Sequence, residues 1–215
     1  MQSITLAPAH VHSIASAVVA CGKNDQTPVL AYVQVSAGAG LVSAVATDRY
    51  RVVRIQFNLG ANESTGAVAD LEPVIIDHAL LTAFARDLKA AKVGPGLDVT
   101  LTVDEGSVTL AHAGGLQRRA EVPTYNFPPA HRLIEDYKAS DVRAVLLKPS
   151  FIADAAKLSL PSDPTAAFTK DAPWSFQVSD SSGSKPGPVL LSRAEPAGIG
   201  SGRIDYMVQP NQILR

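Results

Sequence analysis

The sequence has one cysteine, Cys21, and no long apolar run. Because a single cysteine cannot close an intramolecular disulfide, we expect the chain in a reducing compartment, the cytoplasm. No stretch approaches the roughly eighteen apolar residues of a membrane span. The first five residues, MQSIT, have neither the basic flank nor the apolar core of a signal peptide. These absences argue against a disulfide-stapled secreted domain and against a membrane protein.

Charge is also scarce. Only 18% of the 215 residues are charged and the formal net charge is −1, so a nucleic-acid partner would have to be met by a local basic face. Hydrophobic residues make up 46% of the chain, which is typical of a globular protein. The length allows one large domain or two small ones.

A short apolar strand followed directly by a helix is predicted three times. The three stretches are "ITLAPAHVHSIASAV" (4–18), "VIIDHALLTAFARDL" (74–88) and "VLLKPSFIADAAKLS" (145–159). Their alignment gives each helix a first position that tolerates proline, because the N–H there is unpaired in any case. The aligned residues are Leu6, Ile76 and Leu147 in the strands and Pro8, His78 and Pro149 in the helices. The chain therefore reads as three repeated units.

Each predicted helix carries an apolar stripe at helical spacing. Two sets coincide in the alignment: Val11, Leu81 and Ile152, and Ile14, Phe84 and Ala155. Alternating strands follow, with turns at Gly38–Gly40 and Asp104–Gly106 in the first two units. The third unit is less regular, with strands expected in "PWSFQVSD", "PVLLSRA" and "RIDYMVQPNQIL". The pattern predicts an α+β fold whose antiparallel sheets carry helices on one face.

The units also predict a domain organisation. Two units side by side would make one domain, residues 1–129, and the third would make a shortened second domain, residues 142–215. The polar segment 130–141 is the predicted connector.

No pattern indicates an active site, so no enzyme, cofactor or metal is expected. His10 and His12 are two residues apart at the start of a helix and point to different faces. The glycines of "SAGAGLVS" (36–43) lack dinucleotide-binding spacing and favour a hairpin turn. Cys21 is interpreted as a core residue, and Asp48 as a residue that stabilises a local turn.

One strand is interrupted in an unusual way. "VSAVATDRYRVVRIQF" (42–57) alternates apolar and polar residues, except for five consecutive polar residues at 47–51. A turn, a catalytic cluster and the wall of a binding groove would each explain this break.

Three motifs, in order, carry a family resemblance. "ATDRYRV" (46–52) resembles the segment Ala-Thr-Asp-x-His-Arg-Leu in the middle domain of bacterial DNA polymerase III beta subunits, the sliding clamps. "YNFPPAHRLI" (125–134) resembles their Arg-Phe-Pro-Asp-Tyr connector, and "IDYMVQPNQIL" (204–214) their terminal Tyr-Val-x-Met-Pro-x-Arg-Leu. The likeness extends over nearly the whole chain, but only to the middle domain and part of the last domain of a clamp.

The resemblance implies an apolar groove that receives short peptides from replication proteins. The groove residues carried over from the three motifs are Thr47, Tyr50, Arg51, Val52, Phe127, Pro128, Leu133, Met207, Val208, Gln209 and Pro210. Without the resemblance, Val52, Met207 and Val208 read as ordinary core. Tyr50 stands in place of a histidine and Gln209 in place of a methionine, so a more polar groove with different partner preferences is expected.

The resemblance also implies a DNA-facing side. The polar positions opposite or beyond the apolar stripes are His12, Lys23, Arg86, Lys89 and Lys157. In a ring lined by helices they would meet phosphates without reading bases. Without the resemblance, these residues are interpreted as an ordinary solvated surface in preference to a DNA contact.

The sequence therefore predicts a shortened sliding clamp, expected to be phage-encoded, that encircles double-stranded DNA without sequence preference. It would tether a replicative DNA polymerase and a clamp loader through short peptide motifs. Clamp rings contain twelve such units, so three units per chain predict four chains, whereas two effective domains predict three. The alternative is a non-ring, clamp-like protein that acts as a decoy for host replication proteins.

Overall fold

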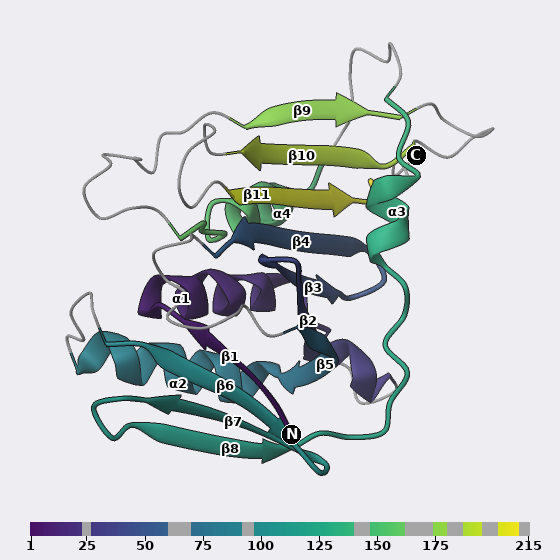
Figure 1. Cartoon of the computed structure of the whole chain (residues 1–215). Coiled ribbons are helices and arrows are strands. Elements are labelled where there is room, and N and C mark those ends of the chain that lie inside the picture. Colours follow the sequence, from purple (N-terminus) through teal and green to yellow (C-terminus); the bar gives the residue numbers. More distant parts are fainter. Residues whose placement is uncertain are drawn as a thin grey trace.

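The computed structural model has two antiparallel sheets with short helices packed on them (Figure 1). It describes residues 1–22, 27–59, 70–91, 97–139, 147–161, 174–179, 187–194 and 202–210. The predicted α+β fold class is confirmed. The longest described helix has 13 residues, and none of the described helices is long and apolar enough to cross a membrane.

The smaller sheet has four strands. Their order is β1 (Gln2–Leu6), β6 (Val99–Asp104), β7 (Ser107–His112) and β8 (Gln117–Glu121). The larger sheet has seven, in the order β5 (Leu71–Asp77), β2 (Tyr32–Gly38), β3 (Leu41–Thr47), β4 (Arg51–Asn58), β11 (Gly202–Val208), β10 (Val189–Ala194) and β9 (Ser175–Val178). Most of the strands expected from the sequence are present, with two differences. Pro28–Ala31 forms a 3-10 helix, η2. The strand expected before the third helix is not seen at Leu147, its one described residue, and Val145 and Leu146 lie outside the described residues.

Both predicted hairpin turns are confirmed. Between β2 and β3 the chain reverses at Ala39 and Gly40, whose φ angles are 49° and 82°. Between β6 and β7, Gly106 has a φ of 72°. Glycine adopts such positive φ angles without steric cost, which explains why these turns form where the sequence places glycine.

The large sheet joins distant parts of the chain. β11 pairs with β4 in antiparallel register, with Met207 opposite Val52 and Val208 opposite Arg51. The strands of the predicted second domain, residues 142–215, therefore continue the sheet of the predicted first domain. The division into two domains stays a prediction, and the described residues show one sheet running across it.

Three helices begin at the aligned positions. α1 (Pro8–Ser16) leads into the 3-10 helix η1 (Ala17–Ala20), α2 covers His78–Ala90, and α4 covers Pro149–Ala155. The repeat therefore fixed the first residue of each helix correctly. Figure 1 shows α1 and α2 side by side, with α4 farther along the large sheet.

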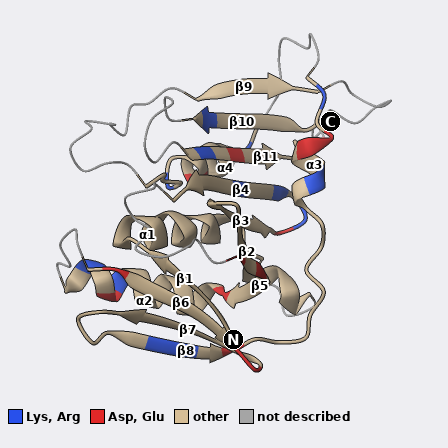
Figure 2. Ribbon diagram, viewed as in Figure 1, with Lys and Arg blue, Asp and Glu red and all other residues tan. Residues whose placement is uncertain are grey.

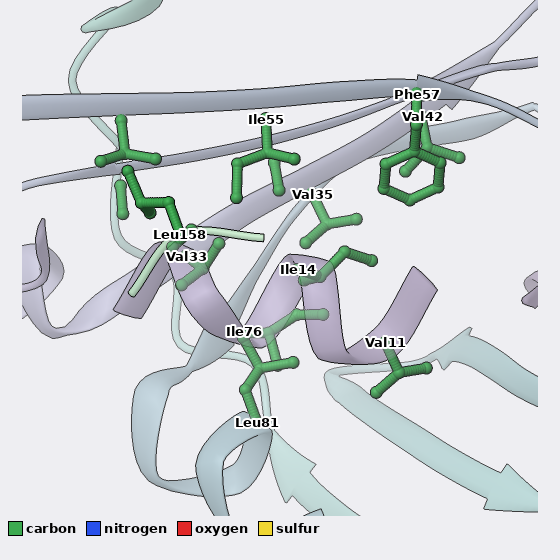
Figure 3. Close-up of a cluster of buried hydrophobic side chains, with 14 of the residues drawn as sticks. Val11, Ile14, Val33, Val35, Val42, Ile55, Phe57, Ile76, Leu81 and Leu158 are labelled. Atoms are coloured by element: carbon green, nitrogen blue, oxygen red, sulfur yellow. The ribbon is translucent and has the colours of Figure 1, made fainter. Parts of the chain in front are cut away.

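The main core packs α1 and α2 against one face of the large sheet (Figure 3). It also includes buried residues of the small sheet, among them Leu101 and Leu110. Five of the six aligned stripe residues are buried, namely Val11, Ile14, Leu81, Phe84 and Ala155. The sixth prediction is wrong, because Ile152 is 49% exposed. In α4 the inward positions are Phe151 and Ala155, so Phe151 takes the place expected of Ile152; Leu158, just beyond the helix, is also in the core.

A second, smaller apolar cluster covers the opposite face of the large sheet. It contains Val45, Val52, Ala130, Ile134, Leu190 and Met207. The predicted connector supplies part of it: a short helix, α3 (His131–Glu135), packs on β4 through the buried Ile134. The first half of the predicted connector 130–141 therefore contains a packed helix, and helices lie on both faces of this sheet rather than on one.

His10 is buried in the main core. Its ring stacks on Phe57 at 4.7 Å, and its Nδ1 accepts a hydrogen bond from the Ala7 backbone N–H at 3.1 Å. Burial lowers the pKa of His10 to about 4, so the ring is neutral in the folded protein at pH 7.

This burial predicts acid sensitivity. In the unfolded chain the pKa of a histidine is about 6.5, so below that pH the unfolded state binds a proton that the folded state binds only near pH 4. The stabilisation is complete above pH 6.5 and is lost as the pH falls towards 4, by about 3 kcal/mol. Urea unfolding of wild type and His10→Gln across this range measures it. Glutamine cannot titrate and can still cap the Ala7 N–H, so this variant should lose much less stability. An equal loss in both proteins would contradict the assignment.

Candidate functional site

The five polar residues that interrupt the strand close a tight turn between β3 and β4. The Asp48 carboxylate accepts hydrogen bonds from the backbone N–H groups of Tyr50 and Arg51, at 3.0 and 2.9 Å. The Thr47 hydroxyl donates to the Arg51 carbonyl at 2.7 Å. These are turn-stabilising bonds of the kind expected of Asp and Thr, so the interpretation of Asp48 as a turn residue is confirmed.

Alternation along β4 sends Arg51 and Val52 to opposite faces of the sheet. Arg51 faces α4, where its guanidinium pairs with Asp48 and Asp154 and lies 5.4 Å from the Phe151 ring. Asp154 also accepts from Lys157 at 2.6 Å. Burial alone would raise the pKa of Asp154, but Lys157 and Arg51 lower it overall. Arg51 therefore ties the turn to α4 and does not face the second cluster.

Val52 lies on the other face, where three distant segments converge. Its strand partner Met207 packs with it in the second cluster, and Ala130 and Ile134 from the connector complete the contact. Just beyond β11, the Gln209 N–H donates to the Tyr50 carbonyl at 2.8 Å. All three sequence motifs therefore meet at one end of the large sheet.

Ion pairs hold α3 against the sheet. Arg54 of β4 bonds Glu135 of α3 at 3.2 Å and Asp205 of β11 at 2.9 Å. Asp205 is fully buried and also accepts from Ser192 and Arg203, each at 2.8 Å. A buried carboxylate needs such partners, because an unpaired charge in the interior is strongly unfavourable.

A largely apolar pocket of about 470 Å³ opens between the turn and the connector. Its lining residues are Thr27, Val29, Leu30, Thr47, Arg49, Val52, Asn126, Pro128, Pro129, Ala130 and Leu133. Four residues predicted for the groove are among them: Thr47, Val52, Pro128 and Leu133. Pro128 and Pro129 keep the chain extended up to α3, and Leu133, on the first turn of that helix, is 56% exposed at the rim.

The other predicted groove residues lie around this pocket or away from it. Tyr50 is 63% exposed and, with Arg51, borders a neighbouring polar pocket of about 520 Å³. Phe127 and Met207 pack in the second cluster beside the pocket. Gln209 is exposed and Pro210 is buried.

Val208, which was predicted as a groove residue, does not line the pocket. It is fully buried in the main core, because it alternates with Met207 along β11 and so faces α4's side of the sheet.

Seven lining residues were not predicted: Thr27, Val29, Leu30, Arg49, Asn126, Pro129 and Ala130. Val29 and Leu30 lie in η2 and Thr27 is its N-cap; the sequence interpretation assigned Pro28, a helix-start signal, to a strand. Asn126, Pro129 and Ala130 belong to the motif "YNFPPAHRLI". Arg49 lies in the motif "ATDRYRV" itself, but its position in the turn directs it to the pocket.

Four of the predicted DNA-facing residues lie on or just after helices: His12 on α1, Arg86 and Lys89 on α2, and Lys157 two residues beyond α4. Arg86, Lys89 and Lys157 are exposed, and His12 is partly exposed. Burial and the nearby charge of Lys89 lower the pKa of His12, which indicates that α1 and α2 bring these two side chains close together. Lys23 lies outside the described residues.

The helix side also carries acidic partners (Figure 2). Asp87 on α2 pairs with Arg118 of β8 at 2.5 Å and lies 3.6 Å from Arg86. Lys157 is held by Asp154. The positive charge on this side is therefore modest and partly neutralised.

This arrangement of repeated helices on curved antiparallel sheets matches solved structures. Over 98% of this chain, it matches the DNA polymerase sliding clamp from Bacillus subtilis with a TM-score of 0.52 and 15% identity. It matches the DNA polymerase III subunit beta sliding clamp from Bartonella birtlesii over 98% of the chain, with a TM-score of 0.61 and 13% identity. The fold is that of a sliding clamp.

The match to these clamps covers only part of each. The chain spans 49% of the Bacillus subtilis protein and 65% of the Bartonella birtlesii protein. No protein-family model and no curated protein matches the sequence. At identities this low the likeness establishes the clamp fold, and the function has to be argued from the site.

Proposed function

We propose that this protein is a clamp-like binding protein that holds short peptides of replication proteins in the apolar pocket. The observation that carries the proposal is the convergence of the three motifs, joined by the Gln209–Tyr50 hydrogen bond and the Met207–Val52 pair. They come from parts of the chain about 150 residues apart in sequence and meet beside one pocket.

The pocket is suited to an apolar anchor. Apolar walls from Val29, Leu30 and Val52 face Pro128 and Leu133 across it, and a volume of about 470 Å³ accommodates one or two large side chains. Short motifs bind in this way, with most of the affinity carried by a few buried anchors. The floor is fixed by the second cluster and by the Arg54 ion pairs, so the pocket exists before a peptide arrives.

Fluorescence polarisation with a labelled, leucine-containing polymerase peptide tests this proposal. Leu133→Ala and Met207→Ala should each weaken binding by about tenfold or more, since one removes rim contact and the other loosens the floor. Leu97→Ala is the matched control: Leu97 is 48% exposed and does not line the pocket, so binding should be unchanged. Equal binding by wild type and Leu133→Ala would remove the pocket assignment.

We further propose that copies of the chain assemble into a ring of three or four around duplex DNA. Within the described residues, β9 pairs only with β10 and leaves its outer edge open, with Phe176 57% exposed on it. Open edges of this kind favour pairing with another chain. The exposed Arg86, Lys89 and Lys157 would then meet phosphates weakly, which suits movement along DNA because strong phosphate contacts would slow it.

A further inference from the structure

Arg49 occupies an unusual backbone position at the pocket. It is the first of the two central residues of the β3–β4 turn, and its φ is 78°. Glycine is favoured at such positions, because a side chain there meets its own backbone. Only one other non-glycine residue in the described chain, Ala39, has a positive φ. A strained arginine that persists at a pocket suggests that its side chain is needed there.

Arg49 also differs from the other charged groups around it. It lines both the apolar pocket and the neighbouring polar pocket, and it is the one charged residue among those lining the apolar pocket. Its guanidinium bonds the neutral hydroxyl of Thr27. Arg51 and Arg54, in contrast, are neutralised by carboxylates.

Two further charged residues, Asp48 and Arg51, line the polar pocket. The Arg51 guanidinium lies 2.6 Å from the Asp48 carboxylate, so these two charges neutralise each other. Among the described residues, no carboxylate pairs with Arg49. An exposed guanidinium that no described carboxylate compensates, at the boundary of the two pockets, is placed to meet an anion that enters with an apolar group.

We propose that Arg49 selects peptides with an acidic side chain next to the apolar anchor. This inference rests on the proposed peptide-binding function. The anchor would fill the apolar pocket, and the neighbouring Asp or Glu side chain would pair with Arg49 as the peptide continues over the polar pocket. Because Arg49 lies between the two pockets, the carboxylate belongs to a residue within the peptide and not to its end.

Two C-terminally amidated, labelled peptides test the proposal. They are identical except for Asp or Asn beside the leucine anchor, and they are compared by fluorescence polarisation on wild type, Arg49→Gln and Arg86→Gln. Wild type should bind the Asp peptide roughly tenfold more tightly, as a charge-assisted pair predicts. Arg49→Gln should lose this preference and bind the two peptides equally. Arg86→Gln, an exposed arginine on α2, should keep the preference.

A third variant separates selection from a structural role. Arg49→Gly should raise the melting temperature, because glycine accepts a φ of 78° without strain, and should still lose the preference for Asp. Equal binding of both peptides by wild type, or a preference that survives in Arg49→Gln, would overturn the role of Arg49.

The outcomes distinguish this inference from the proposed function. If the Asn peptide binds and Leu133→Ala weakens it, but Asp brings no gain, the pocket assignment stands and only the role of Arg49 fails. If neither peptide binds wild type, the peptide pocket itself fails. If Arg49→Gln changes the oligomeric state and the peptides compete with assembly, a second copy occupies the pocket and the inference is overturned.

Discussion

Asp205→Ala should lower the free energy of unfolding by roughly 3–5 kcal/mol. The Asp205 side chain is buried and accepts hydrogen bonds from Arg54, Ser192 and Arg203. Its removal leaves Arg54, whose side chain is only 13% exposed, without its buried counter-charge. An uncompensated buried charge is among the most destabilising changes that a single substitution can make.

Urea unfolding measures this effect, with Asp98→Ala as the control. Asp98 is exposed and its side chain makes none of these bonds, so its replacement should change stability by less than about 0.5 kcal/mol. Replacing both partners, as in Arg54→Met with Asp205→Leu, should recover a large part of the loss, because no buried charge is then left unpaired; Arg203 and Glu135, which lose a partner, are about half exposed. If Asp205→Ala were as stable as Asp98→Ala, the ion-pair network would not be what fixes the connector to the sheet.

Asp205→Ala should also weaken peptide binding in the pocket. Arg54 links Asp205 to Glu135 of α3, and α3 carries Leu133 and Ile134. We therefore expect the folded fraction of Asp205→Ala to bind peptide more weakly than wild type, although Asp205 does not line the pocket.

Regular, local features could be predicted from the sequence. The aligned Pro8, His78 and Pro149 gave the first residue of three helices, because a helix start depends on the residues at its own end. The two hairpin turns followed from glycines between alternating strands. The stripe in α4 failed at Ile152, because a helix of seven residues gives too few turns to fix its orientation by alignment alone.

The site was predicted less completely, since it depends on contacts between distant segments. α3 has one buried apolar residue, Ile134, so its five residues show no helical period and read as a linker. Val208 was assigned to the groove because the motif does not say which face of the sheet it occupies, and the pairing with Arg51 decides that. Asp205 gave no signal, because a buried aspartate in a strand makes sense only once Arg54 is placed beside it.

The second prediction with a large expected effect is that the proposed ring is retained on circular DNA and lost from linear DNA. A closed ring around a circular duplex cannot leave by diffusion along the DNA, whereas on a linear duplex it slides off the ends. The interactions with phosphate are expected to be weak, since Asp87 and Asp154 partly neutralise the helix side, so retention would depend on topology. Raising the salt concentration should therefore release the protein from linear DNA far more readily than from circles.

Retention on matched circular and linearised duplex DNA, followed by gel filtration after a high-salt wash, tests the central claim most directly. Light scattering on the same preparation reports whether the chains form a trimer or a tetramer. We predict that the assembled protein stays with the circular DNA, at least tenfold more than with the linear form, and is released when a restriction enzyme cuts the circle. Equal loss from both forms, or a monomer at micromolar concentration, would contradict the clamp account.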